Sequence, residues 1–159
     1  MKYSDDLFDE NQDLKFASVF GILCAIASAF ATVYNAEAAY IFLAILIGNF
    51  IALKVDGIHH ILTLIVYIAI SLILGLPELS FVILLICILA ALFDEVGHEL
   101  ISKVTDNTFL NLFFEYRCVM KVVILMLAVC GVFSFWIFLC FISFEIAYEI
   151  AGMIFEKFN

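Results

Sequence analysis

The sequence has little positive charge and few of the residues that interrupt helices. It contains one proline and seven glycines among 159 residues, and seven lysines and arginines against sixteen aspartates and glutamates. The resulting net charge of −9 excludes a nucleic-acid-binding face, which needs clustered basic side chains. It also argues against attachment to anionic lipid through a polybasic segment. We therefore expect no nucleic-acid partner.

Paired cysteines and catalytic signatures are missing as well. The five cysteines lie in apolar runs without a Cys-x-x-Cys spacing, so we interpret them as reduced packing residues. There is no Gly-x-Ser-x-Gly motif, no phosphate-binding glycine loop and no His-Glu-x-x-His zinc protease motif. Nucleophilic hydrolysis therefore has no support in the sequence.

Apolar residues, in contrast, make up 67% of the chain, and its mean hydropathy is +1.21. Both values lie far above those of soluble proteins, so the sequence predicts an all-α, multi-pass transmembrane bundle in the lipid bilayer of the cell membrane. Residues 1–15 are acidic, the opposite of the basic start of a secretory signal, and we expect a solvated cytoplasmic tail there. Residues 16–157 then form a single transmembrane domain.

Four apolar runs predict the first four spans, at residues 16–34, 38–53, 58–76 and 79–102. The capping cluster at residues 105–108 predicts a new helix beginning near Phe109. The stretch 109–155 is too long for one crossing of a hydrocarbon core of ~30 Å, so we divide it near residues 131–134. The prediction is six spans, with five as the alternative if the last segment lies differently.

The basic residues give an independent prediction of topology. In a six-span arrangement, all seven fall on or near one side of the membrane: Lys2, Lys15, Lys54, Lys103, Arg117, Lys121 and Lys157. The positive-inside rule then predicts that both termini are cytoplasmic.

Ionisable residues at the edges of the apolar runs predict a polar site at the cytoplasmic side, because such groups are costly in lipid. The candidates for metal ligands are Asp56, His59, Asp94, Glu95, His98 and Glu115. Asp56/His59 and Glu95/His98 are acid-x-x-His pairs, which share a helical face and also occur in di-iron helical bundles. Imidazole and carboxylate ligands suit a divalent metal such as Zn, Fe or Mn. The alternatives are a hydrogen-bonded network that holds helix ends together, and proton handling without a metal.

A second set of charges predicts ion pairs inside the membrane. Arg117 and Lys121 project away from the Glu115 side of their helix, whereas the last helix carries Glu145 and Glu149 at helical spacing. We predict that Lys121 or Arg117 pairs with Glu149 or Glu145, because an unpaired charge in low dielectric is costly. The alternative is a path for cations or protons along the glutamates.

The first span has a face of small residues, which favours close helix packing within the bundle or against another subunit. These residues are Gly21, Ala25, Ser28, Ala29 and Thr32. We therefore expect that this helix forms a homo-oligomer or a contact within a larger membrane complex.

Three function classes agree with these features. The first is a metal-dependent enzyme acting on a lipid or other amphiphile at the cytoplasmic leaflet, and the polar cluster favours it. The second is a small transporter or ion-binding membrane component, supported by the glutamate stripe. The third is a structural subunit of a membrane complex, supported by the small size of the chain.

Overall fold

The structure is a computed structural model, and it describes residues 4, 7–8, 14–54, 57–104 and 107–158. Within these residues it contains seven helices and no strand, which confirms the prediction of an all-α fold. The helices are α2 (Leu14–Tyr34), α3 (Ala36–Ile51), α4 (Ile58–Leu74), α5 (Phe81–Val104), α6 (Thr108–Glu115), α7 (Cys118–Val129) and α8 (Phe135–Phe158).

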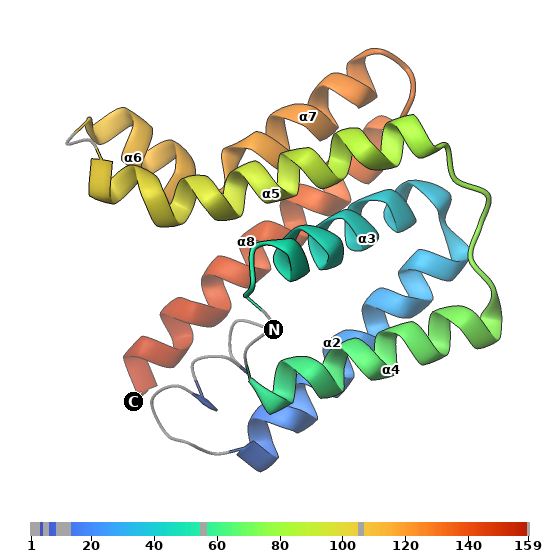
Figure 1. Ribbon diagram of the computed structural model, residues 1–159, viewed down its shortest axis with the longest axis horizontal. Helices are drawn as coiled ribbons and strands as arrows, with labels where there is room; N and C mark the ends of the chain where they lie inside the picture. Colours follow the sequence, from blue (N-terminus) through green and yellow to red (C-terminus); the bar gives the residue numbers. More distant parts are fainter. Residues whose placement is uncertain (1–3, 5–6, 9–13, 55–56, 105–106, 159) are drawn as a thin grey trace.

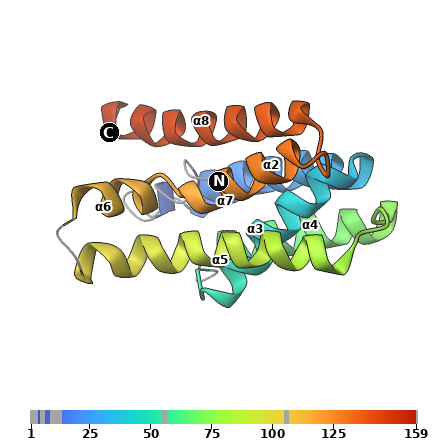
Figure 2. The same ribbon diagram turned by 90° about the horizontal axis from the view of Figure 1, so that it is seen from above.

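The helices pack mainly in two pairs, α2 with α4 and α3 with α5 (Figure 1). Contacts between α2 and α3 join the pairs, α7 packs on α5, and α8 packs on α7. Figure 2 shows α8 running along one edge of the molecule. This arrangement leaves α8 with fewer neighbours than α5, which lies against α3, α6 and α7.

Small residues allow these close helix contacts. On the small-residue face of α2, Gly21, Ala25, Ala29 and Thr32 are buried, while Ser28 is half-buried. A Cβ atom at Gly21 would collide with Thr63 of α4. The Thr32 and Tyr67 hydroxyls lie 2.8 Å apart and form a hydrogen bond between α2 and α4. In the structure, this face therefore packs against α4 of the same chain.

Three helical segments are long and apolar enough to cross a membrane: Leu14–Tyr34, Phe81–Ile101 and Phe135–Phe155. Three shorter apolar helices accompany them, Ala36–Ile51, Ile58–Leu74 and Cys118–Val129. Large apolar side chains are exposed along one face of α4 at spacings of three and four residues: Ile58, Ile61, Ile65, Ile68 and Leu72. An exposed apolar stripe of this kind is what a lipid-facing helix presents, so the structure agrees with association with a membrane.

The helix expected to begin near Phe109 is interrupted, which corrects the sequence-based division of residues 109–155. Asn107 caps α6 as the capping cluster predicted, since its side chain accepts from the Phe109 and Leu110 amides. However, α6 ends at Glu115, and α7 begins only after Arg117, which has left-handed backbone angles (φ 47°, ψ 54°). The break near residues 131–134 is present, because α7 ends at Val129 and α8 starts at Phe135.

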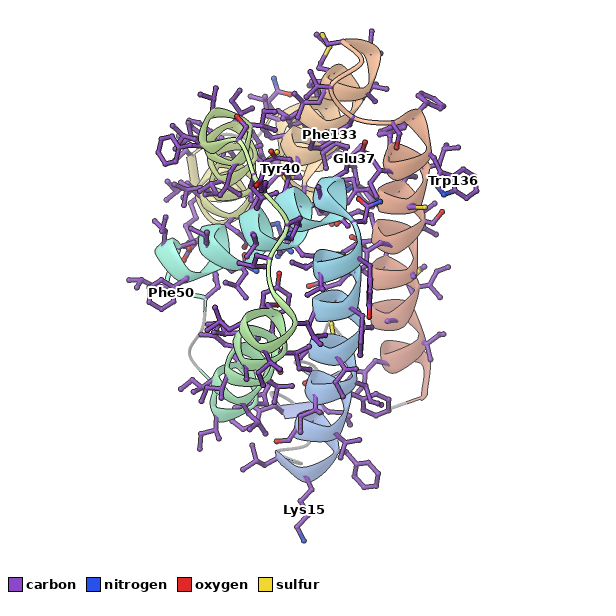
Figure 3. The ribbon with its side chains drawn as sticks, turned by 90° about the vertical axis from the view of Figure 1, so that its right-hand side faces the viewer. Lys15, Glu37, Tyr40, Phe50, Phe133 and Trp136 are labelled. Carbon is purple, nitrogen blue, oxygen red and sulfur yellow. The ribbon has the colours of Figure 1, made fainter. Side chains whose placement is uncertain are left out.

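Side chains of α3 cap two other helices at the end of the bundle where α7 connects to α8. The Glu37 carboxylate accepts from the Ser134 amide at 3.0 Å and from the Ser134 hydroxyl at 2.6 Å, just before α8. The Tyr40 hydroxyl accepts from the Ser80 amide at 2.5 Å, just before α5. Figure 3 shows Glu37 and Tyr40 at this end with Phe133, whose ring centroid lies 5.6 Å from that of Tyr40. These contacts fix where α5 and α8 begin.

Candidate functional site

Asp94 of α5 forms the N-terminal cap of a different helix. Its side chain is 2% exposed, and its two carboxylate oxygens accept from the Val119 and Met120 amides at 2.8 and 2.7 Å. These amides are the second and third of α7, the positions that an N-cap side chain normally satisfies. The carboxylate also lies at the positive end of the α7 dipole. Asp94 therefore replaces the local cap that Arg117 does not provide.

Glu95, the next residue on α5, binds Arg117 itself. The Arg117 Nη2 atom lies 3.0 Å from Glu95 Oε1 and 3.4 Å from Glu95 Oε2. The guanidinium also lies over the ring of Tyr148 in α8, 5.6 Å from the ring centroid. Asp94 and Glu95 together therefore stabilise the α6–α7 break: Asp94 binds the start of α7, and Glu95 binds Arg117 within the break.

Lys121 of α7 forms an ion pair with Glu145 of α8, and the two charged atoms are 2.8 Å apart. The Lys121 ammonium also donates to the Tyr116 carbonyl oxygen. This is one of the four pairings considered from the sequence, whereas Arg117 binds a glutamate on α5 instead. Glu149 is exposed on α8.

His98 and Glu115 line one pocket of about 300 Å³ between α5 and α6. Asn111 lines the same pocket, and Gly97 and Phe114 form its apolar part. A Cβ atom at Gly97 would collide with the Phe114 ring, so the glycine allows α6 to lie close to α5. His98 and Glu115 are both exposed. The pocket therefore offers an imidazole, an amide and a carboxylate to a polar group.

The remaining candidate ligands lie elsewhere. His59 belongs to α4 and is 2% exposed. The centroid of its ring lies 4.6 Å from that of Phe8 and 4.2 Å from that of His60. It belongs to the α2–α4 pair, whereas His98 belongs to α5, which packs on α3, α6 and α7. Asp56 lies outside the described residues. Within the described residues, no three His, Cys, Asp or Glu side chains lie close enough to hold a metal ion.

Two residues of these sites, Asn111 and Tyr148, are not among the predicted site residues. Asn111 lines the His98 pocket, and Tyr148 covers the Arg117 guanidinium. Asn111 precedes Glu115 by four residues, so both lie on one face of α6. This spacing alone could have predicted that Asn111 accompanies Glu115. Tyr148 had no comparable signal, because its partner lies on another helix.

Comparison with known proteins gives no match from which a function could be inferred. No protein-family model matches the chain, and no curated protein or solved structure shows significant similarity to it.

Proposed function

We propose that this is a multi-pass protein of the cell membrane with six spans and both ends of the chain in the cytoplasm. The support is the position of the helix ends. The α2–α3, α4–α5 and α7–α8 connections lie toward the right of Figure 1, while α2 and α4 begin, and α5 and α8 end, toward the left. Lys15 lies at the start of α2, Lys103 in the last turn of α5, and Lys54, which follows α3, forms an ion pair with Glu99 of α5. The positive-inside rule favours a cytoplasmic face at the end that holds these three lysines, whereas Arg117 and Lys121 lie at and after the α6–α7 break.

Reporter fusions at the two ends of the chain test this topology. A reporter that is active only in the cytoplasm should be active at both ends, and one that is active only outside should be inactive at both. Opposite results at the two ends would reject an even number of spans.

At this cytoplasmic face we propose that the protein binds the headgroup of a phospholipid in the His98 pocket. The observation that carries the proposal is that His98 and Glu115, from separate helices, line one pocket together with Asn111. An imidazole N–H can donate to a phosphate oxygen, and a carboxylate can accept from an ammonium group. These two groups favour a zwitterionic headgroup that carries phosphate and amine, such as phosphoethanolamine.

A second form of this proposal adds a metal-dependent reaction on the bound lipid. His98 and Glu115 would supply two ligands to Zn, Fe or Mn, and water or the lipid phosphate would have to complete the coordination. Elemental analysis of the detergent-purified protein distinguishes the two forms. A stoichiometric metal that is lost in His98→Ala but kept in His60→Ala would support metal-dependent chemistry, and its absence would leave headgroup binding alone.

Native mass spectrometry with added lipids tests the headgroup proposal. The protein should retain phosphatidylethanolamine in preference to phosphatidylglycerol, which lacks the amine. His98→Ala and Glu115→Gln should each weaken this preference, whereas His60→Ala and Glu78→Gln, which change residues outside the pocket, should leave it intact. Equal retention of both lipids by the unmodified chain would overturn the proposal.

A further inference from the structure

A second cleft of about 300 Å³ lies between α7 and α8, apart from the His98 pocket. Its α8 wall carries Ile142, Ile146, Ile150 and Met153, at spacings of four, four and three residues. Side chains at these spacings share one helical face, so the wall is a continuous apolar stripe. This wall belongs to α8, the helix that runs along one edge of the molecule (Figure 2).

Three charged side chains interrupt this apolar lining: Lys121, Glu145 and Glu149. Lys121 and Glu145 neutralise each other across 2.8 Å, and their side chains are only 22% and 14% exposed. The Lys121 ammonium is further occupied by the Tyr116 carbonyl oxygen. This lysine is therefore already engaged by groups of the protein.

Glu149 is the charge that this arrangement does not balance. It lines the cleft one helical turn after Glu145, is exposed, and forms no hydrogen bond or ion pair within the described part of the chain. Among the described residues of the lining, one positive and two negative side chains give a net charge of −1. In a helix that faces lipid, a lone carboxylate is costly unless a positive group approaches it.

We propose that this cleft binds a monovalent organic cation with an apolar body. Its positive group would neutralise Glu149, and its apolar part would lie along the isoleucine stripe. Ca²⁺ fits poorly, because it needs about six to eight oxygen ligands and Glu149 is the one carboxylate outside the ion pair among the described residues of the lining. An anionic amphiphile would meet the uncompensated carboxylate, and an uncharged lipid chain would leave it unneutralised.

Binding of two ions of the same shape and opposite charge tests this inference. The probes are tetraphenylphosphonium and tetraphenylborate, measured by equilibrium dialysis against the full chain in an uncharged maltoside detergent, with protein-free micelles subtracted. The cation should bind saturably, and the anion should bind at least about tenfold more weakly. Equal binding of both ions would overturn the proposal, because it would reflect apolar contact alone.

Substitutions at Glu149 locate the site. Glu149→Gln should weaken binding of tetraphenylphosphonium about tenfold, and Glu149→Asp should keep most of it. Glu78→Gln is the matched control, since it removes an exposed glutamate outside the cleft. Glu149 is exposed, so its replacement should leave the thermal unfolding temperature unchanged. Unchanged cation binding in Glu149→Gln would overturn the proposal, whatever happens to phospholipid binding in His98→Ala.

Discussion

At the scale of single residues, Asp94 is the least exposed of the described acidic side chains. It is 2% exposed, and both of its oxygens are used by backbone amides of another helix. A buried carboxylate in such a position stabilises the fold by satisfying donors that would otherwise remain unpaired. The α6–α7 break therefore depends on a residue more than twenty positions earlier in the chain.

Replacing Asp94 should destabilise the protein more than replacing an exposed acid on the same helix. Asp94→Ala leaves the Val119 and Met120 amides without their acceptor, and we expect a loss of about 2 kcal/mol in the free energy of unfolding. Asp94→Asn keeps one acceptor oxygen and should lose about half of that amount. Glu99→Ala is the control, because its ion pair with Lys54 is exposed and should contribute little. Denaturation followed by circular dichroism in detergent measures each change, and equal losses at Asp94 and Glu99 would contradict the capping role.

At the scale of helices, packing depends on close approach at a few small residues. Gly48 of α3 faces α5, where an added Cβ atom would lie 2.9 Å from the Ala91 Cβ and 3.2 Å from the Leu92 backbone nitrogen. Backbone atoms cannot move aside as a flexible side chain can. The distance between α3 and α5 is therefore set by the absence of a side chain at this position.

Gly48→Ala should destabilise the protein even though alanine is the better helix former. Intrinsic propensity alone would favour alanine by roughly 1 kcal/mol, whereas overpacking costs about 1–3 kcal/mol. We expect a net lowering of the thermal unfolding temperature. Ala91→Gly in the same chain removes the nearest contacting atom and should recover part of the loss. A Gly48→Ala variant more stable than the unmodified chain would show that the helices separate freely here.

The ion pair between α7 and α8 gives a second prediction at this scale. Lys121→Glu and Glu145→Lys should each destabilise the protein, because each places two like charges at a contact of 2.8 Å. The double exchange restores the opposite charges, so it should recover about 1 kcal/mol relative to the sum of the single changes. Thermal unfolding of the four chains measures this coupling. Strictly additive losses would mean that the pair does not hold α8 against α7.

At the scale of the whole molecule, the two ends of the bundle differ in their polar chemistry. One end holds Lys54, Glu99 and the His98 pocket, and the other holds the Glu37 and Tyr40 caps. The 12 residues of α7 span only about 18 Å at 1.5 Å per residue, less than a hydrocarbon core of about 30 Å. In the proposed topology, α6 and α7 therefore form the fifth span jointly, with the Arg117 break between them.

Cysteine labelling tests this arrangement. Cys130 is exposed at the end of α7, and the proposed topology puts it outside the cell. In a chain that keeps only this cysteine, a membrane-impermeant thiol reagent should label intact cells. A Lys103→Cys variant without the native cysteines is the control. It should be labelled only after permeabilisation, because Lys103 lies in the last turn of α5, which the proposed topology places in the cytoplasm. Labelling of both positions in intact cells would contradict the proposed orientation.

The sequence by itself determined the helical class and most helix boundaries. Long apolar runs can satisfy their backbone groups in lipid only as helices or closed barrels, and the observed helices follow the predicted runs within a few residues. The Asn107 cap and the break before Phe135 were also predictable, because capping side chains and glycine act on their own neighbours in the chain. These features depend on local chemistry.

Only the tertiary structure decided which charges meet. Equal depth in the membrane suggested one centre containing His59, Asp94 and His98, but depth does not specify which helices are neighbours. The structure divides these residues among the α2–α4 pair, the cap of α7 and the pocket against α6. The break at Arg117 has the same origin: residues 109–129 read as one apolar helix, and the carboxylates that stabilise its interruption come from α5. Contacts between distant residues follow from helix packing, which a single sequence does not encode in its local pattern.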